Sequence, residues 1–159
     1  MRRAIHMIVV HGKKKHFKHK ISFESNTNNL KRIGKMKPLK LAYSYWLPFK
    51  GFSSITLFGF LVRRRDKKNV PVSDKTWTHE SIHHAQSQDF HLWYFGYILF
   101  YIWYVLEWIL KLPSALFGYR PYYSISLEQE AYRNQSNPNY LNERKHFAWL
   151  KYVFKLKKR

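Results

Sequence analysis

The chain of 159 residues contains no cysteine and few acidic residues, and both absences narrow what it can do. Without cysteine it has no disulfide, no thiolate metal ligand and no cysteine nucleophile. Any metal site must therefore use histidine and carboxylate ligands. Only nine aspartates and glutamates accompany 29 lysines and arginines, which gives a formal net charge of +20. Such an excess favours anionic partners, either lipid headgroups or nucleic-acid phosphates.

Much of the positive charge lies near the N-terminus. Residues 1–37 are rich in lysine, show no sustained hydrophobic period and are predicted to form a disordered basic tail, with Met36 as an alternative start. Residues 38–159 are predicted to form a single domain. The apolar run at residues 4–10 is short, contains His6 and precedes lysines, so we expect no secretory signal peptide. The expected location is cytoplasmic or membrane-associated.

The most informative motif is His-Glu-x-x-His, formed by His79, Glu80 and His83. Helix-start residues precede it, and apolar residues give the following stretch one hydrophobic side. Histidines four positions apart lie on the same helix face, so both imidazoles can bind one metal ion. The glutamate is then placed to activate a water molecule on that ion. The alternative is a histidine-rich, partly exposed helix start, with Glu80 favoured by the positive end of the helix dipole.

Two segments before the motif are predicted to form an aromatic segment packed over the domain and a β-strand or hairpin. Residues 38–50 are aromatic, bounded by prolines, and expected to pack over the domain. Residues 51–63 are β-branched and aromatic, which predicts one strand or a hairpin bent at Gly59. The edge of that strand either pairs with an extended substrate or is simply part of the core.

Residues 92–112 form a long aromatic run after the motif. Its length reaches that of a transmembrane helix, but Glu107 is costly in lipid and the aromatics are typical of membrane interfaces. If His83 and a later glutamate bind the same ion, the chain must fold back. This disfavours a simple span and predicts either a buried core hairpin or a helix in the membrane interface.

Two further helices are predicted, which makes the domain mainly α within an α+β class. Residues 124–134 carry Glu128 and Glu130, which point about 200° apart on a helix and cannot both face one ion. Residues 140–154 are predicted to form one C-terminal amphipathic helix. His84 is expected to be solvated.

These segments resemble the glutamate-zincins, metallopeptidases in which a later helix supplies a glutamate ligand, and most closely a small bacterial His-Glu-x-x-His family. The likeness covers roughly residues 48–154. It lies in Gly-Phe-Ser-Ser-Ile-Thr-Leu at 51–57, the motif with Gln86, the aromatic helix and Ser-Leu-Glu-Gln-Glu-Ala-Tyr at 126–132. It implies a zincin-like helical domain that binds one Zn²⁺ and cleaves a peptide or protein substrate.

The resemblance also assigns roles. It implies Glu80 as the general base, and as zinc ligands it implies His79, His83 and Glu128. Supporting roles fall to Gln86, Glu130 and Tyr132, where Tyr132 stands in place of the family's aspartate and brings a phenol instead of a charge.

Two alternatives involve no catalysis. In the first, the basic tail and Arg63–Arg65 bind nucleic-acid phosphates while aromatic residues stack on bases. In the second, the aromatic helix lies at an anionic membrane surface.

Overall fold

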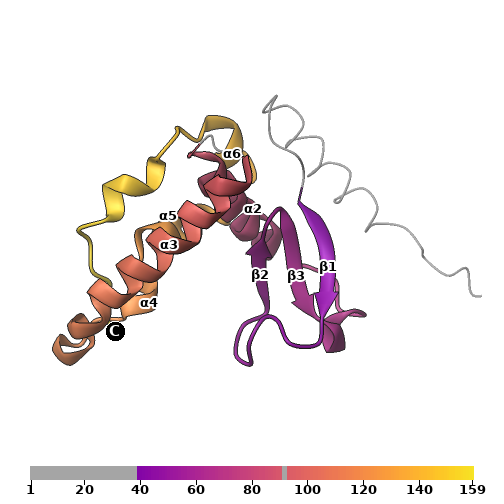
Figure 1. The fold of residues 1–159 in the computed structure, drawn as a ribbon, viewed down its shortest axis with the longest axis horizontal. Helices are drawn as coiled ribbons and strands as arrows, with labels where there is room; N and C mark the ends of the chain where they lie inside the picture. The colour runs from indigo at the N-terminus through magenta and orange to yellow at the C-terminus, as the bar shows by residue number, and fades with distance from the viewer. Residues whose placement is uncertain (1–38, 91–92) are drawn as a thin grey trace, which may run out of the picture.

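The computed structural model describes residues 39–90 and 93–159. These residues form a mainly helical domain with a small three-stranded sheet, so the predicted α+β class is confirmed. The sheet lies on one side of the molecule and the helices on the other, with the C-terminal segment outermost (Figure 1). The tail predicted at residues 1–37 lies outside the described residues.

The sheet consists of β1 (Lys40–Ser44), β2 (Ser54–Leu57) and β3 (Phe60–Arg64), in the order β1-β3-β2. β1 is parallel to β3, and β2 pairs with β3 as an antiparallel hairpin. The turn residues Phe58 and Gly59 both have positive φ, 46° and 84°, which suits a two-residue hairpin loop. Of the two alternatives for residues 51–63, one strand or a hairpin bent at Gly59, the hairpin is the one that forms. β1, within residues 38–50, was not predicted.

Helix α2 (Asp74–Gln88) carries the motif and lies at the centre of the domain, against β2, α3 and α5. A short 3-10 turn, η1 (Arg65–Lys67), separates it from the sheet. The Ser73 side chain caps the helix by accepting a hydrogen bond from the Thr76 amide at 3.1 Å. Helix formation at the motif, on which the metal hypothesis depends, is therefore confirmed.

Helix α3 (Trp93–Lys111) packs against α2 along one face. Gly96 permits the close approach, because a Cβ there would lie 2.5 Å from the Ser87 main-chain oxygen. The stretch Phe95–Phe117 is long and apolar enough to cross a membrane, yet only 28% of its most apolar window is buried. The inner face joins a core of Phe100, Ile125, Leu127 and Trp149, while the outer face is exposed. A fully buried core hairpin is therefore not what forms.

A return path leads from α3 to the second half of the site. It consists of η2 (Leu112–Phe117), α4 (Pro121–Ser124) and α5 (Ser126–Asn134). The buried Glu107 carboxylate of α3 accepts hydrogen bonds from the Ser126 amide at 2.9 Å and the Ser126 hydroxyl at 2.6 Å. Lys111 pairs with the same carboxylate and donates to the Ser124 carbonyl. A carboxylate at a helix N-terminus is stabilising, so α3 fixes where α5 begins.

The single helix predicted over residues 140–154 is wrong. The segment instead forms α6 (Tyr140–Glu143) and η3 (Ala148–Tyr152), interrupted between residues 144 and 147. Arg144 is extended there because its buried guanidinium donates two bonds to Asp89, at 2.8 and 2.6 Å, and two to Glu130, at 2.6 and 3.3 Å. Bidentate ion pairing of a buried arginine outweighs one continued helical turn.

Candidate metal centre

Helices α2 and α5 bring three potential metal ligands together. The Nε2 atoms of His79 and His83 lie 3.1 Å apart. Glu128 places Oε2 3.5 Å from the His79 Nε2 and Oε1 3.4 Å from the His83 Nε2. All ligand atoms of the group lie within 4.8 Å of one another, close enough to hold a metal ion. The chain thus folds back as the sequence predicted.

The hydrogen bonds on the far side of each imidazole determine which nitrogen faces the centre. The Nδ1 of His83 lies 2.8 Å from the Gln86 amide oxygen, and the Nδ1 of His79 lies 3.2 Å from the Gln135 amide oxygen. Each Nδ1 is therefore assigned as the protonated donor, which leaves a lone pair on each Nε2. Two such lone pairs beside a carboxylate form a donor set that could hold a metal ion.

The separations fit a small tetrahedral ion. Zinc binds imidazole nitrogen and carboxylate oxygen at about 2.0–2.1 Å, so neighbouring ligands of a tetrahedron lie about 3.3 Å apart. The distance between the two imidazole Nε2 atoms, 3.1 Å, and the distance from the His79 Nε2 to the Glu128 Oε2, 3.5 Å, bracket that value. Three protein ligands would leave the fourth position of a tetrahedral ion for water or substrate, which is typical of catalytic zinc sites.

The two oxygens of Glu128 have different surroundings. Oε1 accepts hydrogen bonds from the hydroxyls of Tyr104 at 2.8 Å and Tyr122 at 2.9 Å. Oε2 is buried and has no hydrogen-bond partner. The two phenols therefore occupy the lone pairs of Oε1, and Oε2 is the oxygen available to an ion.

Charges within the cluster shift its titration. Burial lowers the pKa of His83, but the nearby Glu128 carboxylate outweighs it and raises this pKa to about 9. Burial raises the pKa of Glu128, yet the two imidazoles outweigh it and hold the pKa well below its usual range. Burial, and then the charge of Glu128, raises the pKa values of Tyr104 and Tyr122, so both phenols stay protonated donors. The pocket favours positive charge next to an ionised carboxylate.

A buried polar chain continues outward from His83. Gln86 accepts from the imidazole and donates its amide hydrogens to the Leu127 carbonyl at 3.0 Å and to Glu130 at 3.1 Å. Because those two acceptors fix the amide, its oxygen must face the histidine. Glu130 also accepts from Arg144 and from Tyr140. Gln86 and Glu130 lie where the sequence put them, behind the ligands, and Glu130 faces away from the centre.

Glu80 lies beside the centre, in contact with the edge strand β2. Its Oε1 accepts from the Ser54 hydroxyl at 2.7 Å, and its Oε2 accepts from the Thr56 hydroxyl at 2.8 Å. Residues i and i+2 of a strand share a face, so both hydroxyls reach one carboxylate. The sequence analysis missed this pair, although Ser54 and Thr56 alternate within the stretch predicted as a strand.

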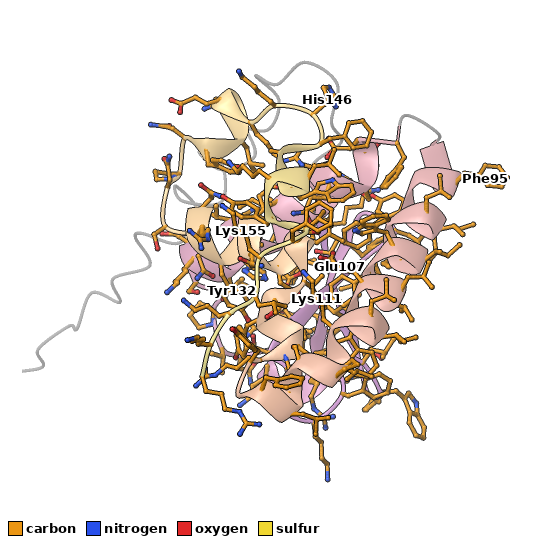
Figure 2. The ribbon with its side chains drawn as sticks, turned by 90° about the vertical axis from the view of Figure 1, so that its left-hand side faces the viewer. Phe95, Glu107, Lys111, Tyr132, His146 and Lys155 are labelled. Atoms are coloured by element: carbon orange, nitrogen blue, oxygen red, sulfur yellow. The ribbon has the colours of Figure 1, made fainter. Side chains whose placement is uncertain are left out.

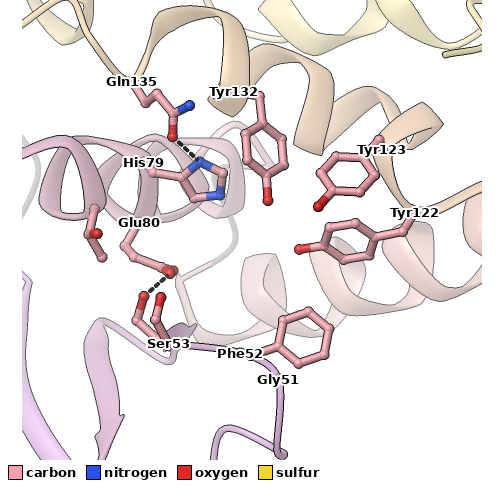
Figure 3. Close-up of a pocket in the computed structure, with 11 residues that line it drawn as sticks. Gly51, Phe52, Ser53, His79, Glu80, Tyr122, Tyr123, Tyr132 and Gln135 are labelled. Carbon is pink, nitrogen blue, oxygen red and sulfur yellow. Dashed lines mark hydrogen bonds between the residues drawn. The ribbon is translucent and has the colours of Figure 1, made fainter. Parts of the chain in front are cut away.

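A cavity of about 440 Å³ opens onto His79 and Glu80 (Figure 3). Its remaining wall is largely aromatic, formed by Phe52, Tyr122, Tyr123 and Tyr132. Tyr132 packs edge-on against His79, with ring centroids 4.7 Å apart, and burial raises its pKa to about 12. Gln135, which the sequence analysis missed, holds the His79 Nδ1 instead. Tyr132 therefore supports the ligand by packing.

The structure differs from the sequence predictions for His84 and for the arginines at 63–65. His84 is buried, with its Nδ1 2.7 Å from the Tyr97 hydroxyl, so it is not the solvated residue that was expected. The arginines at 63–65 do not form one cationic cluster. Arg63 is buried and donates to the Val70 carbonyl, Arg64 pairs with Asp66, and Arg65 lies over the Tyr45 ring.

Comparison with known proteins gave no match. No family model matches the chain, and neither a curated protein nor a solved structure does. The candidate centre is therefore argued from the geometry of the described residues.

Proposed function

We propose that the protein is a zinc-dependent metallohydrolase of the glutamate-zincin kind, acting as a peptidase. The observation that carries the proposal is the cluster of the His79 Nε2, the His83 Nε2 and the donor-free Glu128 Oε2. The two imidazole nitrogens lie 3.1 Å apart and Oε2 lies 3.5 Å from the His79 Nε2, both close to the edge length of a tetrahedral zinc site. Zinc bound there would supply Lewis acidity and lower the pKa of a water molecule towards 7.

The chain's own residues would perform the remaining steps. Glu80 would take a proton from the attacking water and transfer it to the leaving amine. The hydroxyls of Ser54 and Thr56 orient its carboxylate without neutralising it. Because β2 is an edge strand and residues 51–54 line the cavity, an extended peptide can pair with that edge and present a carbonyl to the centre.

The first experiment measures metal content. Elemental analysis of the purified protein should give about one zinc per chain for the wild type and for Glu80→Gln, and none for His83→Ala. His146→Ala is the matched control, because this histidine lies near the surface and outside the centre, and it should retain zinc. A wild-type protein that stays metal-free after incubation with zinc would refute the proposal.

The second experiment separates metal binding from catalysis. A library of fluorescence-quenched peptides should be cleaved by the wild type, and cleavage should fall by at least about a hundredfold in Glu80→Gln. Zinc binding without cleavage of any peptide would leave a metal-binding protein and remove the peptidase assignment. Equal cleavage by both proteins would show that Glu80 is not the base.

A further inference from the structure

The outward face of α3 consists of large apolar and aromatic side chains. The exposed positions follow the helical repeat, and we call them the α3 apolar face: Phe95, Ile98, Leu99, Ile102, Val105, Leu106, Trp108, Ile109 and Leu110. Figure 2 shows Phe95 pointing away from the molecule, whereas Glu107 and Lys111 point into it. The face runs from Phe95 to Leu110, so it is about 23 Å long. A patch of this size on a folded protein marks a contact surface.

Within residues 95–111, the tyrosines and the charged side chains of α3 are directed inward. Tyr97 reaches His84, Tyr101 reaches the Thr56 carbonyl, Tyr104 reaches Glu128 and Lys111 reaches Glu107. A helix on a water-facing surface has the opposite arrangement, with polar residues outside and apolar residues inside. The pattern is that of a helix whose outer side meets hydrocarbon.

Positive charge is held at the end of this face. The C-terminal residues run beside the turn that follows α3, with the Arg120 amide bonded to the Lys157 carbonyl at 2.8 Å and the Arg159 amide bonded to the Gly118 carbonyl at 3.1 Å. Figure 1 shows the C-terminus next to the end of α3. The same turn exposes Leu116 at 87% and Phe117 at 76%. Exposed cations thus flank exposed apolar side chains.

No exposed carboxylate lies within residues 93–134. Within residues 93–134 the acidic side chains are Glu107, Glu128 and Glu130, and all three are buried. An anionic surface would therefore meet lysines and arginines with no exposed carboxylate from these helices to repel it.

We propose that the α3 apolar face and the adjoining basic C-terminus bind the surface of an anionic lipid bilayer, with α3 lying flat in the interface. This inference does not depend on the metal centre. A membrane-spanning orientation is disfavoured because the inner face of α3 holds the buried ion pair of Glu107 and Lys111, which is bonded to Ser126 of α5. A second copy of the chain would bring like charges together, whereas anionic headgroups neutralise them.

Vesicle sedimentation tests the apolar contribution. The full chain should sediment with vesicles of equal phosphatidylcholine and phosphatidylglycerol. The double variant Ile102→Glu with Leu106→Glu should lose at least about tenfold in partitioning, because two apolar side chains leave the lipid and two anions face it. Both residues are half-exposed, at 50% and 52%, so the fold tolerates the change. Val70→Glu is the matched control at 49% exposure in the loop after β3, and should bind as the wild type does.

A second variant tests the charge contribution and keeps the proposal falsifiable if the first fails to fold. Replacing Lys157, Lys158 and Arg159 with glutamine leaves their main-chain bonds intact. Binding to the mixed vesicles should fall by on the order of a hundredfold, and raised salt should abolish the difference. Binding to pure phosphatidylcholine should be weak for every variant.

Three results would overturn the inference. The first is a wild type that ignores anionic vesicles, and the second is variants that bind as well as the wild type. The third is a stable dimer in sedimentation equilibrium that the Ile102→Glu and Leu106→Glu changes dissociate. Resistance of the bound protein to carbonate extraction would overturn the flat orientation. Release by carbonate, with unchanged zinc content in the variants, is the expected outcome.

Discussion

Replacing Gln86 with leucine tests whether the buried chain behind His83 positions the metal ligand. Leucine has nearly the volume of glutamine but can neither accept nor donate a hydrogen bond. The His83 Nδ1, the Leu127 carbonyl and one oxygen of Glu130 would each lose a partner at a site that excludes water. Each unsatisfied buried group costs about 1–3 kcal/mol, and Glu130 keeps other donors, so we expect a loss of about 3 kcal/mol in unfolding free energy.

The same change should weaken zinc binding. Without the Gln86 oxygen, the imidazole of His83 is no longer held with Nε2 towards the centre, and loss of such a partner typically lowers metal affinity by about 10–100-fold. Urea denaturation with and without zinc measures the stability, and competition with a chromogenic chelator measures the affinity.

The matched control is Gln135→Leu, which removes the equivalent partner of His79. Gln135 is half-buried, so water can replace its oxygen and the effect should stay within about threefold. If both variants behave alike, or if Gln86→Leu changes neither quantity, the buried chain does not position His83 and the reasoning fails.

Two further predictions concern titration and packing. The raised pKa of His83, about 9 in the metal-free site, means that zinc must displace a proton, so its affinity should rise about tenfold per pH unit between about pH 6 and 8. The metal-free protein should show the opposite trend, with the stability from this pair complete below pH 6.5 and lost as the pH rises through about 9. Chelator competition across pH measures the first and urea denaturation the second, and flat profiles would contradict the pairing with Glu128. Gly96→Ala should destabilise the fold by about 1–2 kcal/mol, because its Cβ meets the Ser87 oxygen at 2.5 Å and overpacking outweighs the gain in helix propensity. A higher midpoint in thermal denaturation would refute the close contact.

The helices that carry the candidate ligands could be predicted from local sequence patterns alone. The spacing of His79 and His83 places both imidazoles on one face of a helix, and the opposite directions of Glu128 and Glu130 follow from helical geometry alone. The hairpin at Gly59 follows from β-branched residues around a glycine.

Long-range pairing explains what was missed. The interrupted C-terminal helix depends on Arg144 reaching Asp89, 55 residues earlier, and hydrophobic periodicity carries no information on such a partner. The roles of Gln135 and Tyr104 likewise appear only when α5 and α3 are placed against α2. β1 was not recognised, since its pairing with β3 joins segments about twenty residues apart.

The unequal oxygens of Glu128 have a consequence for ion selectivity. Because Oε1 accepts hydrogen bonds from two phenols, Glu128 can offer a cation only Oε2. The other two ligand atoms of the centre would be the imidazole nitrogens of the histidines. Calcium seeks six to eight oxygens, frequently with both from one carboxylate, and magnesium seeks an octahedral shell. Neither demand is met by this donor set, whereas borderline-soft ions of the zinc type prefer imidazole. If the centre binds zinc as proposed, Tyr104 and Tyr122 would favour it over calcium and magnesium by leaving Glu128 one free oxygen.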